Sequence, residues 1–170
     1  HASNKFSNLK KINIDNVNLL EVAWTYKFDQ KGVIPGNPIY NNGSIYLSST
    51  NKSLVALNAN DGMKKWEYKT EGIAAARGLL IDEKKESKIY FCDQQNLIAL
   101  KASDGTPILN FGNKGKIKLK KKCQITPVII DDKIIIGTFE PSIEVYDLNN
   151  GNLLWRFYLK KKYNKFFRYG

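Results

Sequence analysis

The 170-residue sequence predicts an all-β fold, a β-propeller built from four-stranded antiparallel blades. Three observations support this prediction: a nine-residue motif occurs three times, a tight-turn dipeptide ends each copy, and tryptophans follow at regular intervals. Repeats of about 40 to 50 residues are typical of propeller blades. The chain is expected to be a partial propeller, with about three blades plus one additional outer strand.

The nine-residue motif aligns without gaps in its three copies. They read LVALNANDG at residues 54–62, LIALKASDG at 97–105 and IEVYDLNNG at 143–151. The closing Asp-Gly and Asn-Gly pairs favour tight hairpin turns, because Gly, Asn and Asp tolerate the positive φ that such turns require. Each copy is therefore expected to be a strand that ends at a corner.

Large apolar residues mark the same position after each corner. Trp66, Leu109 and Trp155 each lie five residues after the Asp or Asn of the turn, and Trp24 precedes all three. These four positions are 42, 43 and 46 residues apart. The spacing predicts repeats at about 30–70, 72–112 and 123–160, preceded by an opening segment, 1–29, whose residues 22–28 form the outer strand of the closing blade.

Four short strands are expected in each repeat. In a repeat, the second strand is nearly all apolar, which suits a strand covered on both faces, and the last alternates, as an outer strand does. The expected strands are 38–40, 44–47, 54–58 and 64–69 in the first repeat, 78–81, 88–92, 97–101 and 107–109 in the second, and 127–130, 133–138, 143–147 and 153–159 in the third.

The number of blades indicates a fragment of a longer protein. A propeller closes with at least about four blades. Three blades and a spare strand would leave an uncovered blade face and an open sheet edge. We therefore expect further blades in another segment.

The formal charge of +11 comes almost entirely from lysine, with arginine only at Arg77, Arg156 and Arg168. Lysine is a hydrated point charge that suits a solvated surface better than planar recognition of bases or phosphates. A dispersed basic surface is favoured over nucleic-acid binding. The lysine-rich run at 114–122 alternates with Ile117 and Leu119, which indicates an exposed edge strand or hairpin.

Few residues in this chain could carry out catalysis or hold a metal. His1 is the only histidine, so no Ser-His or Cys-His nucleophile can be built. Cys92 and Cys123 are too few for a four-cysteine metal site. Cys92 is interpreted as a small buried residue of a strand, and a bridge to Cys123 stays open. No catalytic or metal-ligating residue is predicted.

Several motifs resemble the amino-terminal part of the pyrroloquinoline-quinone (PQQ) dependent dehydrogenases, closest to the quinoprotein glucose dehydrogenase branch. The resemblance runs over nearly the whole chain. In this family, the tryptophan of each repeat docks against the neighbouring blade. The matching segments are NLKKIN at residues 8–13, VAWTY at 22–26, the Asp-Gly to Trp element at 59–66, and DGTPILNFGNKG at 104–115.

The resemblance implies oxidation of alcohols or sugars in the periplasm, by PQQ bound beside a calcium ion on the propeller axis. The electrons would pass to a quinone or cytochrome acceptor. One residue carries over, Arg77 in the run ARGL at 76–79, where family members have an Arg-Gly pair near the quinone. Its guanidinium offers paired donors to a carboxylate or to quinone oxygens. A purely structural arginine remains an alternative.

The catalytic base and the calcium ligands are expected outside this chain, so that the fragment alone would be inactive. No apolar run is long enough to span a bilayer, so any membrane association would need a region that is not present here. An alternative function is a non-catalytic propeller that serves as a scaffold for assembly at the envelope, since one fold hosts many functions.

Overall fold

A computed structural model of the chain describes residues 10–49, 51–84, 86–123, 125–140 and 142–159. In this part of the chain, the regular elements are twelve strands and one short 3-10 helix, η1 (Val17–Leu19). The strands form three antiparallel four-stranded sheets, which confirms the predicted all-β propeller architecture. The predicted boundaries at residues 1 and 160 lie outside the described residues.

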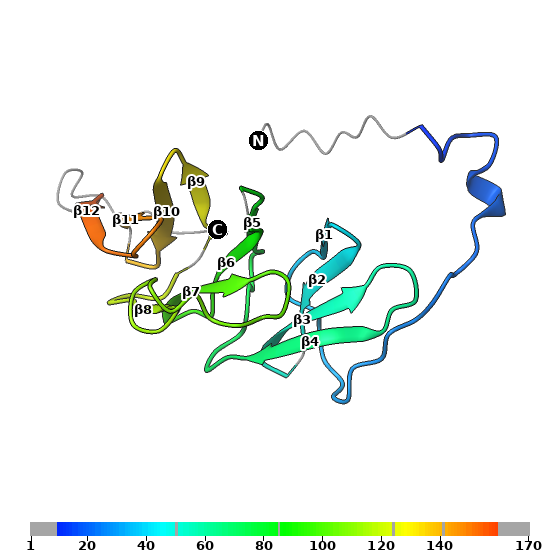
Figure 1. Cartoon of the computed structure of the whole chain (residues 1–170), viewed down its shortest axis with the longest axis horizontal. Coiled ribbons are helices and arrows are strands. Elements are labelled where there is room, and N and C mark those ends of the chain that lie inside the picture. Colours follow the sequence, from blue (N-terminus) through cyan, green and yellow to red (C-terminus); the bar gives the residue numbers. More distant parts are fainter. Residues whose placement is uncertain (1–9, 50, 85, 124, 141, 160–170) are drawn as a thin grey trace.

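Each sheet is a meander in which consecutive strands are neighbours (Figure 1). The first sheet contains β1 (Ile39–Asn41), β2 (Ser44–Ser48), β3 (Ser53–Asn58) and β4 (Lys64–Lys69). The second contains β5 (Leu80–Asp82), β6 (Lys88–Cys92), β7 (Asn96–Lys101) and β8 (Lys116–Lys118). The third contains β9 (Val128–Ile130), β10 (Lys133–Thr138), β11 (Ser142–Asp147) and β12 (Leu153–Tyr158).

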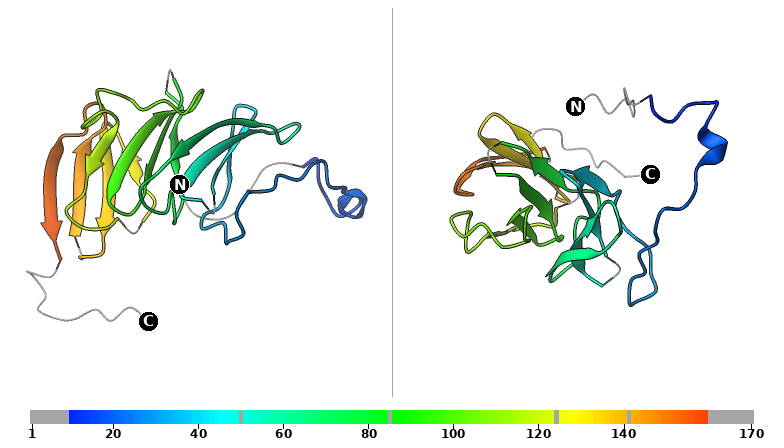
Figure 2. Two further views of the ribbon diagram at one scale, coloured as in Figure 1. Left: turned by 90° about the horizontal axis from the view of Figure 1, so that it is seen from below. Right: turned by 45° about the vertical axis from the view of Figure 1, so that its right-hand side comes forward.

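The three sheets follow one another as blades, and the segment before β1 leads away from them (Figure 2). The first strands β1, β5 and β9 lie along one side, and the fourth strands β4, β8 and β12 lie toward the other (Figure 1). The second and third strands are the most buried, and β3 and β7 each have five consecutive buried residues. These strands form the cores between neighbouring blades, as their continuous apolar runs predicted.

The fourth strand of the second repeat was predicted in the wrong place. Residues 107–109 form no strand, and Pro107 makes only an isolated bridge to Leu100. Proline has no backbone N–H to donate to a ladder. The chain instead loops out and returns as β8, which pairs with β7 at the edge of the sheet. The lysine-rich run therefore does contain an exposed edge strand, and the second blade extends past residue 112.

The predicted outer strand at residues 22–28 forms no sheet ladder in the described structure. A strand needs a partner for its backbone groups, and the described sheets offer none at this position. Trp24, Tyr26 and Phe28 nevertheless pack on apolar residues of the first blade. The indole of Trp24 also donates to the carbonyl oxygen of Ala59 at 3.0 Å. The segment thus makes the expected side-chain contact, and its role as the outer strand of a blade completed elsewhere stays a prediction.

The first two blades meet through a docked tryptophan. The Nε1 of Trp66 in β4 donates to the carbonyl oxygen of Ala102 in the second blade at 3.1 Å. Gly105, in the turn that follows, has φ +73°, and a Cβ there would lie 2.6 Å from the indole ring. Trp24 packs against Gly62 of the first blade in the same way. The Asp-Gly corner therefore forms a turn and also provides the surface on which the indole packs. This surface at the corner glycine is called the seat.

The second and third blades meet differently. Leu109, which matches the tryptophan position in sequence, is 72% exposed. Ile117 of β8 occupies the position that the indole has at the first interface. A Cβ added at Gly151 would lie 2.8 Å from the side chain of Ile117, so this side chain packs on the corner glycine. The loop before β8 adds a hydrogen bond from the N–H of Gly112 to the carbonyl oxygen of Asn150, at 2.8 Å. An inserted loop thus replaces the tryptophan contact.

A disulfide also joins this second pair of blades. Cys92 ends β6, and Cys123 lies in the segment that leads to the third blade. The two residues are bonded, with their Cα atoms 6.1 Å apart and a sequence separation of 31. Both cysteines are also buried in the apolar core between the blades. Cys92 is therefore a buried strand residue, as interpreted, and the open question of a bridge is answered by the geometry.

Candidate functional site

Arg77 lies in a tight turn directly before β5, the first strand of the second blade. The turn is closed by a hydrogen bond from the N–H of Gly78 to the carbonyl oxygen of Ala75, at 2.8 Å. Ala75 is buried and has φ +45°, a conformation that is uncommon for residues other than glycine. The surrounding contacts therefore hold this turn in shape, while the side chain of Arg77 is exposed.

The first blade supports the turn from one side. A Cβ at Gly36 would lie 2.8 Å from the carbonyl oxygen of Ala75, so only glycine allows the chain to pass this close. The hydroxyl of Ser48 donates to the same carbonyl oxygen at 3.4 Å. The segment before β1 therefore lies directly against the arginine turn.

The second and third blades hold the turn at two further points. The N–H of Ala75 donates to the carbonyl oxygen of Cys92 at 2.9 Å. The hydroxyl of Thr126, just before β9, donates to the carbonyl oxygen of Arg77 at 2.7 Å. Contacts from all three blades thus converge on four residues, which leaves the backbone of Arg77 little freedom.

The guanidinium of Arg77 has no ion pair with any residue that the structure describes. Arg156 differs: its Nε donates to the carboxylate of Glu144 at 2.6 Å, and Glu144 is only 1% exposed. That contact raises the pKa of Arg156. Arg156 is therefore a structural arginine of the third blade, whereas the charge of Arg77 is available to a ligand.

A groove runs along the first strands, beginning two residues after Arg77. It has a volume of about 910 Å³ and is lined by β1, β5, β9 and the residues just before β5 and β9. A smaller cavity of about 20 Å³ lies beside the arginine turn and is bordered by both disulfide cysteines, Gln94 and Ile125. The turn of Arg77 therefore stands at one end of the space between the innermost strands.

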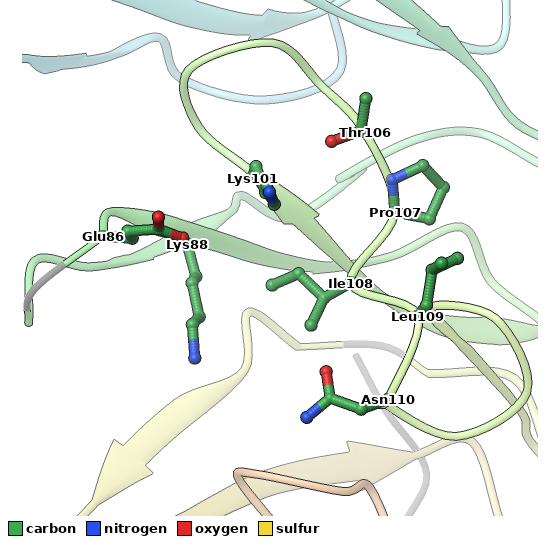
Figure 3. Close-up of a pocket in the computed structure, with 8 residues that line it drawn as sticks. All are labelled: Glu86, Lys88, Lys101, Thr106, Pro107, Ile108, Leu109 and Asn110. Carbon is green, nitrogen blue, oxygen red and sulfur yellow. The ribbon is translucent and has the colours of Figure 1, made fainter.

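Another cavity, of about 590 Å³, lies beside the loop that replaces the tryptophan contact. Lys88 of β6 extends into it past Glu86, and Ile108 and Asn110 border it from the loop (Figure 3). It contains none of the residues that support Arg77. One polar group that lines this cavity already has a partner in the protein, since the amide nitrogen of Asn110 donates to the carbonyl oxygen of Asn149.

Among the described residues, no group of three His, Cys, Asp or Glu side chains is placed to hold a metal ion. Nor does any helix in that part of the chain have the length and apolar character needed to cross a membrane.

Nearly the whole chain matches one protein family. Residues 1–168 match the PQQ family described as the glucose/ethanol/alcohol dehydrogenase β-propeller domain. The chain belongs to this family. The recognition made from the repeats and flanking motifs is therefore confirmed.

Individual relatives agree with the family. The chain is 29% identical to a quinohemoprotein alcohol dehydrogenase, ADH IIB of Pseudomonas putida, over 93% of its length and 25% of the relative's. It is 30% identical to the quinoprotein glucose dehydrogenase of Escherichia coli K12, over 90% of its length and 25% of the relative's. This chain therefore spans about a quarter of the length of these relatives.

Solved structures show the same fold. The quinohemoprotein alcohol dehydrogenase ADHIIG from Pseudomonas putida HK5 superposes with a TM-score of 0.75 at 25% identity, covering 90% of this chain and 24% of that one. BamB from Moraxella catarrhalis has a TM-score of 0.57 at 17% identity, covering 80% of this chain and 39% of that one. The second likeness is one of fold alone.

The arginine turn fits one part of a PQQ molecule. PQQ combines an orthoquinone with three carboxylates, and an exposed guanidinium that pairs with no acid of the described chain offers such groups paired, charge-assisted donors. The described residues supply no comparable set of oxygen ligands for the calcium ion. Sequence reasoning identified Arg77, whose role stays a prediction, but it missed Thr126 and Cys123 as supports of the turn.

Proposed function

We propose that this chain is the propeller segment of a PQQ-dependent dehydrogenase that oxidises alcohols or sugars, with Arg77 as a PQQ ligand. The observation that carries the proposal is the exposed guanidinium of Arg77, which forms no ion pair with any described residue, on a turn held by three blades. Family membership supplies the cofactor class. The relatives named for alcohol and for glucose oxidation support both substrate classes.

In this proposal, the chain binds and orients the cofactor. Arg77 would donate hydrogen bonds to a carboxylate or to the quinone oxygens, and its fixed positive charge would favour an anionic ligand at every physiological pH. Bound PQQ would supply the acceptor for a hydride from the substrate carbon, and the electrons would leave to a quinone or cytochrome. The proton-accepting base and the calcium ligands would come from blades beyond this segment.

A periplasmic location is part of the proposal. Disulfides persist in oxidising compartments such as the bacterial periplasm and are rare in the cytosol. The bond between Cys92 and Cys123 supports such a compartment. Fractionation of the native host, with the protein detected by antibody, would test the location directly: recovery in the cytosolic fraction alone would contradict it.

A dye-linked oxidation assay tests the proposed function. The full polypeptide that carries this chain is titrated with PQQ and calcium, and reduction of the dye is followed with ethanol and with glucose as substrates. We expect activity that depends on both additions and falls at least about tenfold in Arg77→Ala, since a hydrogen bond to a charged group contributes about 1.5 to 3 kcal/mol. PQQ binding without oxidation of any substrate would favour the alternative of an assembly scaffold.

A further inference from the structure

The disulfide lies close to both hydrogen bonds that anchor the arginine turn to the second and third blades. Cys92 accepts the hydrogen bond from the N–H of Ala75 through its own carbonyl oxygen, at 2.9 Å. Cys123 begins the short segment whose Thr126 donates to the carbonyl oxygen of Arg77, at 2.7 Å. The two anchors of the turn thus belong to two blades that the disulfide joins covalently.

Further backbone bonds make the disulfide the centre of this junction. The N–H of Cys123 donates to the carbonyl oxygen of Gln94 at 2.8 Å, directly after the strand that ends in Cys92. Cys123 also forms a bridge with Thr138 of β10. These bonds fix the segment before β9 against both blades. Both cysteines also line the 20 Å³ cavity beside the turn, together with Arg77 itself.

We propose that the Cys92–Cys123 disulfide is a positioning element for Arg77, which sets the place of its guanidinium for an anionic cofactor. The inference rests on the proposed PQQ site. It follows from the two anchors: the backbone of Arg77 is defined by contacts to the second and third blades, and the disulfide fixes the distance between the two contacts. Without the bond, only backbone hydrogen bonds such as that from Cys123 to Gln94 hold the segment before β9 against the second blade, so the hydroxyl of Thr126 that anchors Arg77 is held less firmly.

The blades themselves give a reason for a covalent link here. The first two blades are held by the indole of Trp66 seated on Gly105, but the next interface has only Ile117 at the equivalent seat. A smaller docking side chain buries less apolar area and holds the blades less firmly. The disulfide compensates at the end of the interface where Arg77 lies.

A double-mutant cycle on PQQ affinity tests the inference. Equilibrium dissociation constants for PQQ are measured by dialysis and absorbance on the full polypeptide that carries this chain. The set comprises the wild type, Arg77→Ala, the pair Cys92→Ala with Cys123→Ala, and the combination of all three changes. Alanine is chosen because both cysteines are buried, and it introduces no new polar group into the core.

We expect the cysteine pair variant to bind PQQ about tenfold more weakly, because a misplaced group loses much of its contribution to binding. In the Arg77→Ala background, the same change should add less than about a twofold loss, since the cysteines act through the arginine. A cysteine variant with wild-type affinity would overturn the inference. Losses that multiply in full would also overturn it, because the two sites would then act independently.

Two further variants keep the test decisive if the cysteine variant folds poorly. Thr126→Val removes the hydroxyl that anchors Arg77 and leaves the disulfide intact, and it should weaken PQQ binding several-fold, whereas Thr126→Ser should restore it. Ile117→Ala weakens the same blade interface at the contact with Gly151, which does not involve the arginine turn, and should leave PQQ affinity unchanged. An equal loss in Ile117→Ala would assign the effect to general stability and contradict a positioning role.

Failure of the inference can be distinguished from failure of the proposed function. A wild-type protein that binds no PQQ would refute the function, and with it the positioning role. The wild-type protein can also be reduced by dithiothreitol, alkylated and freed of reagent before PQQ is added, with loss of the disulfide verified by mass spectrometry. An unchanged PQQ affinity after this treatment would refute the positioning role alone.

Discussion

Different contacts hold the first blade to the second and the second blade to the third. In both, a tyrosine of the second strand points toward a carbonyl oxygen of the next blade: Tyr46 donates to Ala102 at 3.1 Å, and Tyr90 donates to Leu148 at 3.5 Å. The first interface adds the indole of Trp66. The second has an inserted loop and a disulfide instead.

The difference shows which parts of a blade repeat are required by geometry and which can be replaced. The corner residue is a glycine with positive φ at both interfaces, +73° at Gly105 and +75° at Gly151, and in both a side chain approaches so closely that a Cβ would not fit. The docking side chain changes from tryptophan to isoleucine. The turn is therefore the constant element, and the group that occupies it varies.

Removal of Trp66 should have the largest effect on stability. Trp66→Ala leaves the seat at Gly105 empty and the carbonyl oxygen of Ala102 without its indole donor. We expect a loss of about 3 to 5 kcal/mol in the free energy of unfolding, as for other large aromatic residues changed to alanine. Urea unfolding followed by circular dichroism measures it. A loss below about 1 kcal/mol would show that the indole does not hold the blades together.

Ile117→Ala should have a smaller effect at the other interface. The side chain is smaller, and the disulfide remains to hold the two blades together. We expect a loss of about 2 kcal/mol, at the lower end for isoleucine changed to alanine. The same urea titration, run with and without reductant, compares the two contributions. If the two changes together cost no more than either alone, the loop and the disulfide would not be separate supports.

The sequence predicted the corner turns of the blades but not all the side chains that pack on them at the interfaces. The Asp-Gly corners and their spacing were visible because a turn leaves a local signature in residue type. The fourth strand of the second blade was missed because it lies after a loop of irregular length that no local pattern defines. Leu109 matched the tryptophan spacing but is exposed, since the inserted loop carries it away from the seat that Ile117 fills.

The site was predictable only in part, for a related reason. Arg77 stood out by its residue type in a lysine-rich chain. Its supports, Thr126 and Cys123, lie about 50 residues away and act through a carbonyl oxygen and a disulfide. Such contacts depend on how the blades are placed, and they leave no local mark in the sequence. The cysteine pairing likewise required the three-dimensional distance between the two residues.

The stability of the two outer strands β4 and β8 should also differ in its dependence on pH, by a smaller amount. Hydrogen bonds from Lys69 and Ser53 lower the pKa of Glu67 in β4 from 4.5 to about 2. A lowered pKa means that Glu67 stabilises the fold above pH 4.5, and that this contribution is lost as the pH falls toward 2. β8 has no carboxylate at all. Acid should therefore weaken the outer strand β4 more than β8, whereas the turn residue Asp104 of the second blade has a pKa that hydrogen bonds from Thr106 also lower.

Glu67→Gln tests this contrast. We expect the variant to lose up to about 1 kcal/mol of stability at pH 7, since its lysine partners are largely exposed, and to differ less from the wild type at pH 3. Urea unfolding at the two pH values measures the difference. A gap between variant and wild type that grows at pH 3 would mean that the carboxylate of Glu67 does not stabilise the fold.

The most direct test of the central claim is a crystal structure of the full polypeptide that carries this chain, grown with PQQ and calcium. The claim is that the blades place Arg77 where it binds the cofactor. We predict that its guanidinium lies within about 2.7 to 3.2 Å of a carboxylate or quinone oxygen of PQQ. Bound PQQ whose polar contacts all come from other residues, with Arg77 turned away, would contradict the claim.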